Sequence, residues 1–241
     1  MENNISAGKC ALVTGSTKGI GLAISKKLAD KGYFVYTNSR DDDTASTELD
    51  TGNHCIIKAD LSTPYGAEYL TEFIRNRAAP LDCVVLNAGT TCRKDFGEIE
   101  YDDWNKVMNT NVNIPFLICQ SLFPVIADFG SIVFIGSDMG IYPHSVSTAY
   151  SVSKSATHML AQSLVKECAD RNIRVNAIAP GFIDTQWQKE KPDWLREKIE
   201  QKIALKRFGT PEEIADACMF LIENTYINGS IVQVDGGYNC F

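Results

Sequence analysis

The sequence lacks the features that mark several large protein classes. It has no run of 18 apolar residues that would cross a membrane as a helix, and Met1-Glu2-Asn3-Asn4 lacks the basic and apolar regions of a signal peptide. It has no surplus of cations: 23 Lys and Arg stand against 30 Asp and Glu, a net charge of −7. Neither a nucleic acid nor an anionic membrane is therefore expected as the main partner. We expect a cytoplasmic protein.

Cysteine and histidine show no spacing typical of a metal site or a disulfide framework. The eight cysteines include no Cys-x2-Cys pair, and several lie within apolar runs, so they are expected to be buried, reduced thiols. His54, His144 and His158 are scattered and do not suggest a ligand set. We predict no bound metal.

What the chain does have is a regular alternation of strand and helix patterns. With 44% hydrophobic residues, its 241 residues can bury a large core. Strands are predicted at residues 10–14, 34–38, 55–58, 83–86, 131–136, 175–179 and 230–234. Helices are predicted at residues 19–31, 65–77, 101–128, 149–171, 193–201 and 211–222. This alternation predicts an α/β protein with a parallel sheet covered on both faces.

A glycine-rich turn joins the first predicted strand to the first predicted helix. It reads Thr14-Gly15-Ser16-Thr17-Lys18-Gly19-Ile20-Gly21, a Gly-x3-Gly-x-Gly spacing. Glycine lets a backbone approach a pyrophosphate closely, and a helix N-terminus presents unpaired amides. The alternative is a purely structural turn. The position between strand and helix favours a nucleotide site.

Tyr150 and Lys154 lie four residues apart on a predicted helix and therefore share one face. A cation beside a phenol stabilises the phenolate and lowers the tyrosine pKa, so such a tyrosine can act as a general acid or base. Alone, the pair is more often a core ring beside a solvated amine.

The order of these motifs resembles that of the short-chain dehydrogenases/reductases. The motifs are Thr14 to Gly21, Asn87-Ala88-Gly89, Asn111, Ser137, Tyr150, Lys154 and Pro180-Gly181, and Ser137 precedes Tyr150 by the family's usual thirteen residues. The resemblance spans about residues 9–238. It implies one doubly wound, Rossmann-type domain over residues 1–241 with a seven-stranded parallel sheet. The glycine-rich cofactor half would cover about residues 9–135, and the catalytic and lid half about residues 136–241.

The resemblance also implies roles in the reduction of a carbonyl. Tyr150 would donate the proton, Lys154 would assist it and hold the nicotinamide ribose, and Ser137 would hydrogen-bond the carbonyl oxygen. Asn111 would help a water chain reach Lys154. From the residues alone, Ser137 could be an ordinary turn serine, and Asn111 could face solvent or link two helices.

A nicotinamide dinucleotide is the cofactor that the resemblance implies. The expected contacts are Gly15, Ser16, Thr17, Lys18, Gly19, Ile20, Gly21, Arg40, Asp60, Leu61, Asn87, Ala88, Gly89, Tyr150, Lys154, Pro180, Gly181, Ile183 and Thr185. After the second strand, Ser39 stands where NAD-binding proteins carry an acid, and Arg40 follows it. Arg40 and Lys18 favour NADP(H), because a guanidinium suits a 2′-phosphate, with NAD(H) as the alternative. The acids at positions 41–43 could pair with Arg40 and weaken this preference.

The substrate is predicted from the second half of the chain. Residues 203–215 and 228–237 most resemble 3-oxoacyl-acyl-carrier-protein reductases of fatty-acid biosynthesis. Residues 186–207 resemble a substrate lid, and with seven cations and four acids they carry a net charge of +3 that could attract an acidic carrier. Arg171 matches a carrier-docking cation, whereas Asp128 replaces the second one. The alternatives are a sugar, steroid or other small-molecule alcohol dehydrogenase and a non-catalytic cofactor-binding regulator.

Further pocket and interface residues are expected around this site. Met139, His144 and Phe182 could line the substrate pocket, and Trp187, Trp194, Leu195, Ile199 and Leu205 could cover it. Apolar faces of the helices through Phe116 and Met159 and the tail 234–238 suggest a homo-oligomer, a homotetramer by resemblance.

Overall fold

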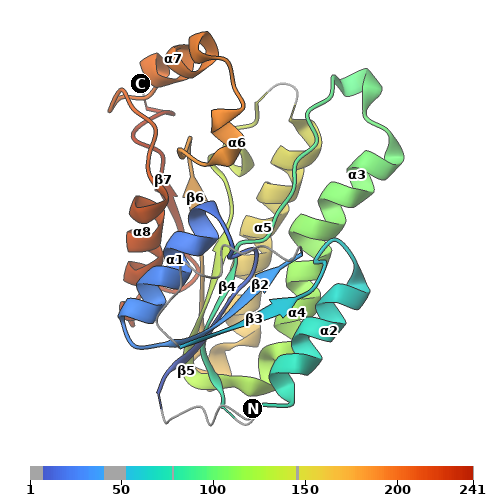
Figure 1. Ribbon diagram of the computed structural model, residues 1–241, viewed down its shortest axis with the longest axis vertical. Coiled ribbons are helices and arrows are strands. Elements are labelled where there is room, and N and C mark those ends of the chain that lie inside the picture. Colours follow the sequence, from blue (N-terminus) through green and yellow to red (C-terminus); the bar gives the residue numbers. More distant parts are fainter. Residues whose placement is uncertain (1–7, 41–52, 78, 145–146, 241) are drawn as a thin grey trace.

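Seven parallel strands form one sheet in the computed structural model, which describes residues 8–40, 53–77, 79–144 and 147–240 (Figure 1). Their order is β3-β2-β1-β4-β5-β6-β7. The strands are β1 (Cys10–Val13), β2 (Phe34–Ser39), β3 (His54–Lys58), β4 (Leu81–Leu86), β5 (Ile126–Ile135), β6 (Arg174–Pro180) and β7 (Ile231–Val234). The predicted seven-stranded, doubly wound architecture is confirmed.

Helices cover both faces of the sheet. They are α1 (Gly19–Asp30), α2 (Pro64–Arg75), α3 (Tyr101–Met108), α4 (Ile114–Leu122), α5 (Thr148–Glu167), α6 (Gln186–Lys189), α7 (Asp193–Lys202) and α8 (Pro211–Glu223). In Figure 1, α1 and α8 lie on one side and α2, α4 and α5 on the other, with α6 and α7 beyond the sheet. Successive side chains of each strand point to opposite faces of the sheet, and this alternation explains the layering. Leu12, Val84 and Phe134 point into the core on the α2–α5 side, whereas their neighbours Val13 and Val85 point towards α1 and α8.

The prediction of one helix over residues 101–128 is wrong in two places. A π-helical turn, Asn109–Asn113, interrupts it between α3 and α4. The helix then ends at Leu122, and a 3₁₀ turn (Phe123–Val125) leads directly into β5 at Ile126. Pro124 lies in that turn and has no N–H to continue a helix, which accounts for the end.

Two smaller differences concern the later helices. The helix predicted to end at Arg171 ends as α5 at Glu167, followed by a 3₁₀ turn (Ala169–Arg171) and a left-handed Asn172. The four-residue α6 was not predicted, because it is too short to show a period of its own. From the sequence we expect residues 41–53 to leave room for only a turn or so of helix, and this segment lies almost entirely outside the described residues.

The strand order reverses between β1 and β4. From β1 the chain moves outward through β2 and β3, then crosses back to place β4 on the other side of β1. The loops after β1 and β4 therefore start side by side at the carboxyl edge of the sheet and lead to helices on opposite faces, and open α/β sheets form their ligand crevice at such a point.

Candidate functional site

The loops after β1 and β4 are fastened together by hydrogen bonds. Thr14 Oγ1 accepts from the backbone N–H groups of Asn87 (2.9 Å) and Ala88 (3.0 Å). The Asn87 amide donates to the carbonyls of Thr14 (3.0 Å) and Gly15 (2.9 Å). Gly15 has a positive φ of 59°, and a Cβ at Gly21 would collide with the Gly15 carbonyl. Glycine is therefore required at both positions, and the turn is held open towards the cleft.

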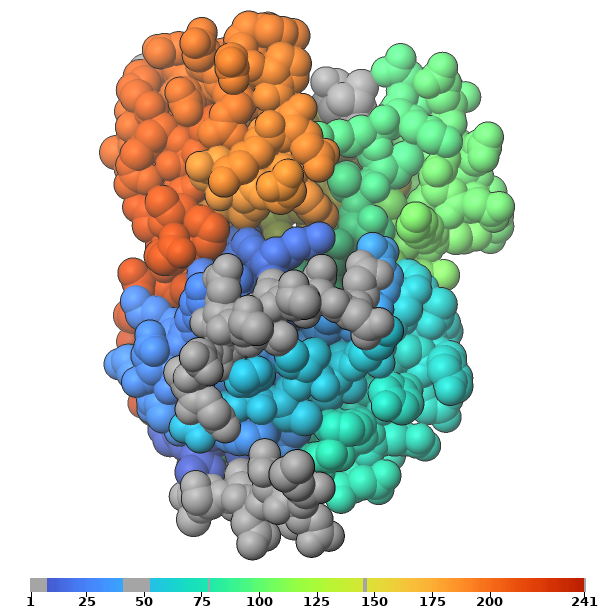
Figure 2. Space-filling view, viewed as in Figure 1, coloured from blue at the N-terminus to red at the C-terminus, as the bar shows by residue number. Residues whose placement is uncertain are grey.

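A cleft of about 650 Å³ lies over this edge, between the two halves that Figure 2 shows above and below it. Nearly all the cofactor residues that the sequence predicted line it. They are Gly15, Thr17, Lys18, Gly19, Ile20, Arg40, Asp60, Leu61, Asn87, Ala88, Gly89, Tyr150, Lys154, Pro180, Gly181, Ile183 and Thr185. The structure thus brings together segments as far apart in the sequence as Gly15 and Thr185.

Ser16 and Gly21 do not line the cleft, although both were predicted to contact the cofactor. Ser16 is buried, and its hydroxyl accepts from the backbone N–H of Asn38 at 2.8 Å, which ties the glycine turn to β2. Gly21 faces Gly15 and Asn87 inside the turn. Both residues shape the turn from behind.

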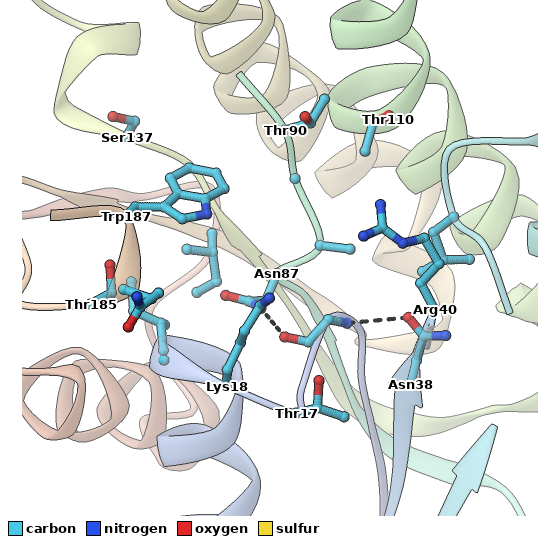
Figure 3. A pocket seen from close by; sticks show the side chains of 18 of the residues that line it. Thr17, Lys18, Asn38, Arg40, Asn87, Thr90, Thr110, Ser137, Thr185 and Trp187 are labelled. Atoms are coloured by element: carbon cyan, nitrogen blue, oxygen red, sulfur yellow. Dashed lines mark hydrogen bonds between the residues drawn. The ribbon is translucent and has the colours of Figure 1, made fainter. Parts of the chain in front are cut away.

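Several lining residues were missed by the sequence reasoning. They are Asn38, Ala59, Ser62, Thr90, Lys106, Thr110, Ile135 and Gly136. Ser39, and Gln186, Trp187 and Gln188 of the expected lid, line the cleft as well. Asn38 and Ala59 lie at or just after the ends of β2 and β3, so their place at the carboxyl edge could have identified them. Lys106 and Thr110 lie near the π turn, and no sequence signal points to them. Figure 3 shows Arg40, which follows β2, and Lys18, at the start of α1, reaching into the cleft, with the Trp187 indole above Lys18.

The residues of the cleft fit a dinucleotide. Helix α1 begins there without a side-chain cap, since Lys18 at the cap position makes no capping hydrogen bond and the first turn holds no acid. By contrast, α8 is closed by a capping box between Thr210 and Glu213. The first amides of α1 thus lack a side-chain acceptor, and a pyrophosphate would supply one.

Asp60 lines the cleft and also stabilises the turn after β3. Its Oδ1 accepts from the Ser62 backbone N–H at 3.0 Å, as a turn-capping aspartate does.

Lys154 is deeply buried under the middle of the cleft. It is 5% exposed, its Nζ donates to the Ile135 carbonyl at 2.7 Å, and burial lowers its pKa to about 8. Nζ lies 5.7 Å from the centre of the Tyr150 ring. A Cβ added at Gly89 would be 3.5 Å from Nζ, so the β4 loop covers the ammonium closely.

Tyr150 and Ser137 meet at the boundary of the cleft. Ser137 follows β5, and a hydrogen bond between the two side chains lowers the Tyr150 pKa, as does the charge of Arg93. Burial acts more strongly, and the net pKa of Tyr150 is raised. Lys154 does not contribute to this lowering here, because its ammonium donates to the Ile135 carbonyl, and its expected role as the partner of the phenolate stays a prediction.

Asn111 lies in the π turn and is 1% exposed. It accepts from the Thr90 N–H (2.8 Å) and donates to the Thr90 carbonyl (2.9 Å) and to Ser153 Oγ (2.9 Å). It therefore joins the β4 loop to α5, rather than facing solvent. A Cβ at Gly89 would lie 3.2 Å from the Asn111 Oδ1, so Asn111 and Lys154 both lie close to this glycine.

A second, smaller cavity of about 70 Å³ adjoins the cleft at Ser137 and Tyr150. Met139, His144 and Phe182 line it, as predicted, and so do Trp187 and Tyr238. The rings of His144 and Tyr238 stack at 5.6 Å, and Phe182 meets Tyr238 edge-on at 5.0 Å. The arrangement places a small aromatic-walled space next to a hydroxyl and a phenol.

The expected lid residues separate into three groups. Trp187 lines both cavities. Ile199 is buried in a small cluster with Ile203 and Phe208, against which Leu195 packs. Trp194 and Leu205 are both 64% exposed and cover neither cavity. Of these five expected lid residues, only Trp187 lines a cavity.

The described residues contain neither a cluster of metal-binding side chains nor a helix long and apolar enough to span a membrane.

Known proteins resemble this chain over nearly its whole length. The family model described as "Enoyl-(Acyl carrier protein) reductase" matches residues 15–239. An uncharacterized oxidoreductase, YmfI, of Bacillus subtilis is 35% identical over 96% of this chain and 99% of its own. The 3-oxoacyl-acyl-carrier-protein reductase FabG of Aquifex aeolicus is 36% identical (95% and 97%), and glucose 1-dehydrogenase 2 of Bacillus subtilis is 33% identical (97% and 96%).

Solved structures with bound cofactor share the fold. The Pseudomonas aeruginosa RhlG/NADP active-site complex superposes with a TM-score of 0.90 at 33% identity, covering 97% of both chains. A blue fluorescent protein from a metagenomic library, in complex with NADPH, gives 0.90 at 29% identity over 95% of this chain and 97% of that one.

Proposed function

This chain belongs to the short-chain dehydrogenase/reductase family as an NAD(P)-dependent oxidoreductase, and we propose that it reduces a 3-oxoacyl thioester with NADPH. The observation that carries the proposal is the convergence of Ser137, Tyr150 and Lys154 where a dinucleotide-sized cleft meets a small aromatic-walled cavity. A cofactor in the first and a carbonyl in the second would meet at these side chains.

The bound nicotinamide would supply the hydride that reduces the carbonyl carbon. Pro180, which ends β6, and Gly181, Ile183 and Thr185, which follow it, would hold the nicotinamide at one side of the cleft. Gly89 allows the loop after β4 to approach the nicotinamide closely from the other side of the cleft.

Tyr150 would give its phenolic proton to the carbonyl oxygen, while the Ser137 hydroxyl donates a hydrogen bond to the same oxygen. Lys154 would hold the ribose hydroxyls and stabilise the phenolate left behind. Asn111 would keep the backbone of Thr90 and helix α5 in place and lead water towards Lys154.

NADPH is proposed as the preferred cofactor on the basis of Arg40 and Lys18. Both cations line the cleft, and Ser39 stands where an acid would accept from a ribose hydroxyl. The NADP and NADPH complexes among similar structures support this choice.

One observation favours a substrate that is not bound to a carrier protein. Arg171, the expected docking cation, pairs with Asp128 at 2.8 Å and also donates to the carbonyls of Phe123 and Ile126. Its charge is therefore balanced within the chain. The alternative function is a small-molecule alcohol dehydrogenase, in line with the glucose 1-dehydrogenase among the relatives.

The test compares substrates under one assay of NADPH absorbance. Acetoacetyl-carrier protein, acetoacetyl-CoA, free ketones and sugars would be offered to the same enzyme preparation. Turnover on the thioesters supports the acyl reductase. Turnover confined to free ketones or sugars would move the chain to the alternative.

A further inference from the structure

His158 lies in line with the two reactive side chains of α5. It follows Lys154 by four residues and Tyr150 by eight, so the three share one face of the helix. The side chain is 4% exposed, and it lines neither cavity. Its contacts are with the segment that carries Ser137.

The imidazole is enclosed by two glycines of that segment. A Cβ at Gly136 would collide with His158 Nε2, and a Cβ at Gly140 would lie 2.9 Å from Cε1. The chain after β5 therefore folds closely around the ring, and any displacement of the ring would move the segment that presents the Ser137 hydroxyl.

His158 also accepts a hydrogen bond from the first backbone N–H after β5 that is not paired with β6. The Gly136 N–H still pairs with the Ile178 carbonyl of β6 at 2.8 Å. The next N–H, that of Ser137, is buried and points to His158 Nε2 at 3.4 Å. An apolar residue at position 158 would leave this N–H without that partner, and a buried unpaired amide is costly.

The acceptor role requires a neutral ring with its proton on Nδ1. Burial and the charge of Lys154 both lower the His158 pKa, to about 4. The ring is thus neutral at neutral pH, and Nε2 keeps its lone pair for Ser137.

We propose that His158 is a positioning residue that holds the Ser137 segment in register with Tyr150 through a buried hydrogen bond to the Ser137 backbone. The proposal rests on the role given to Ser137 in the proposed reduction. It explains why glycine occupies both positions 136 and 140, where a ring rather than a small apolar side chain fills the space.

The test uses His158→Leu, which removes the acceptor at similar size, and His158→Gln, whose amide oxygen can replace it. Removing a hydrogen-bond donor from a reacting oxygen costs about 10² to 10³ in kcat, so a misplaced Ser137 should cost about tenfold in His158→Leu. The dissociation constant for NADPH should stay unchanged, and His158→Gln should recover most of the loss. The same two His158 substitutions would also be made in a Ser137→Ala enzyme.

In that background the two His158 substitutions should have no further effect on kcat, because no hydroxyl remains to be positioned. Losses that multiply with that of Ser137→Ala would overturn the proposal. So would a His158→Gln enzyme as impaired as His158→Leu.

A measurement that needs no turnover separates this proposal from the proposed reaction. ¹⁵N NMR of the histidine rings at pH 7 should show His158 with an unprotonated Nε2. A protonated Nε2 in an active enzyme would refute the positioning role alone. Inactivity of the wild-type protein on every carbonyl would instead refute the proposed reaction.

Discussion

Tyr150 experiences opposite influences on its phenol. Burial raises its pKa, and the hydrogen bond with Ser137 and the charge of Arg93 lower it by less. The phenol is therefore protonated at neutral pH, which suits a group that must give a proton to a carbonyl oxygen.

Tyr150→Phe should remove most reductase activity, because only the transferable proton is lost. General acids contribute about 10² to 10⁴-fold, and a loss of that size in kcat is expected. Binding of NADPH, followed by nicotinamide fluorescence, should be nearly unchanged. Lys154→Ala should lower both the reductase activity and the affinity for NADPH, since Lys154 would bind the ribose and stabilise the Tyr150 phenolate. A Tyr150→Phe enzyme with near-normal turnover would contradict the mechanism.

Arg40→Asp should reverse the cofactor preference from NADPH to NADH. A carboxylate at this place repels the 2′-phosphate and can accept from a ribose hydroxyl. The ratio of kcat/KM for the two cofactors measures the change, and Lys18→Gln should reduce the NADPH preference without reversing it. Equal use of both cofactors by the native enzyme would point to the acids at positions 41–43, which lie outside the described residues.

His158 should make the protein less stable in acid. Its pKa falls from an ordinary 6.5 to about 4 on folding, so between these values the unfolded chain binds the extra proton. Stability should therefore fall as pH falls through this window, by at most about 1.4 kcal/mol per pH unit for one group. Urea unfolding at pH 6.5 and 4.5 should show a smaller loss in His158→Gln than in the wild type. Equal losses would show that His158 titrates normally.

At the scale of elements, the break between α3 and α4 serves the site. The π turn Asn109–Asn113 turns the Asn111 side chain inward to the Thr90 backbone and to Ser153. An uninterrupted helix, as predicted for residues 101–128, would not have this widened turn. π turns commonly mark functional positions in helices.

Asn111→Ala should destabilise the protein by about 1–3 kcal/mol, because it removes a buried amide that pairs with the partly buried Thr90 backbone and with Ser153. Asn113→Ala is the matched control, since Asn113 lies in the same turn, is exposed, and donates only to the Asn109 side chain. Thermal unfolding of both variants measures the difference. A control that is destabilised as much as Asn111→Ala would show that the turn itself, not the buried amide, is sensitive.

At the scale of the whole molecule, α4 and α5 carry exposed apolar side chains. Phe116 is 41% exposed, Val152 42% and Met159 61%, whereas Cys119 of the same predicted face is buried in the core. We expect these side chains to contribute to an interface, because exposed apolar patches mark such sites.

We expect a homotetramer that Met159→Glu weakens, because a charge would be buried between subunits. Light scattering at several concentrations gives the mass. Tyr65→Glu, on α2 away from this face and 77% exposed, should leave the mass unchanged. A wild-type protein of monomer mass would rule out the assembly.

Patterns in the sequence were enough to predict the architecture and most of the residues that line the cofactor cleft. Strand and helix patterns are local, and the glycine turn, Asn87-Ala88-Gly89 and the loop after β6 each follow a strand, so the parallel sheet brings them to one edge. Features that depend on contacts between distant segments were visible only in the folded chain. Within the π turn, Asn111 bonds to Thr90 and Ser153, Arg171 is neutralised because Asp128 pairs with it, and His158 meets Ser137 because two glycines leave room for its ring. Such pairings carry no local pattern, since each partner's environment is created by the fold itself.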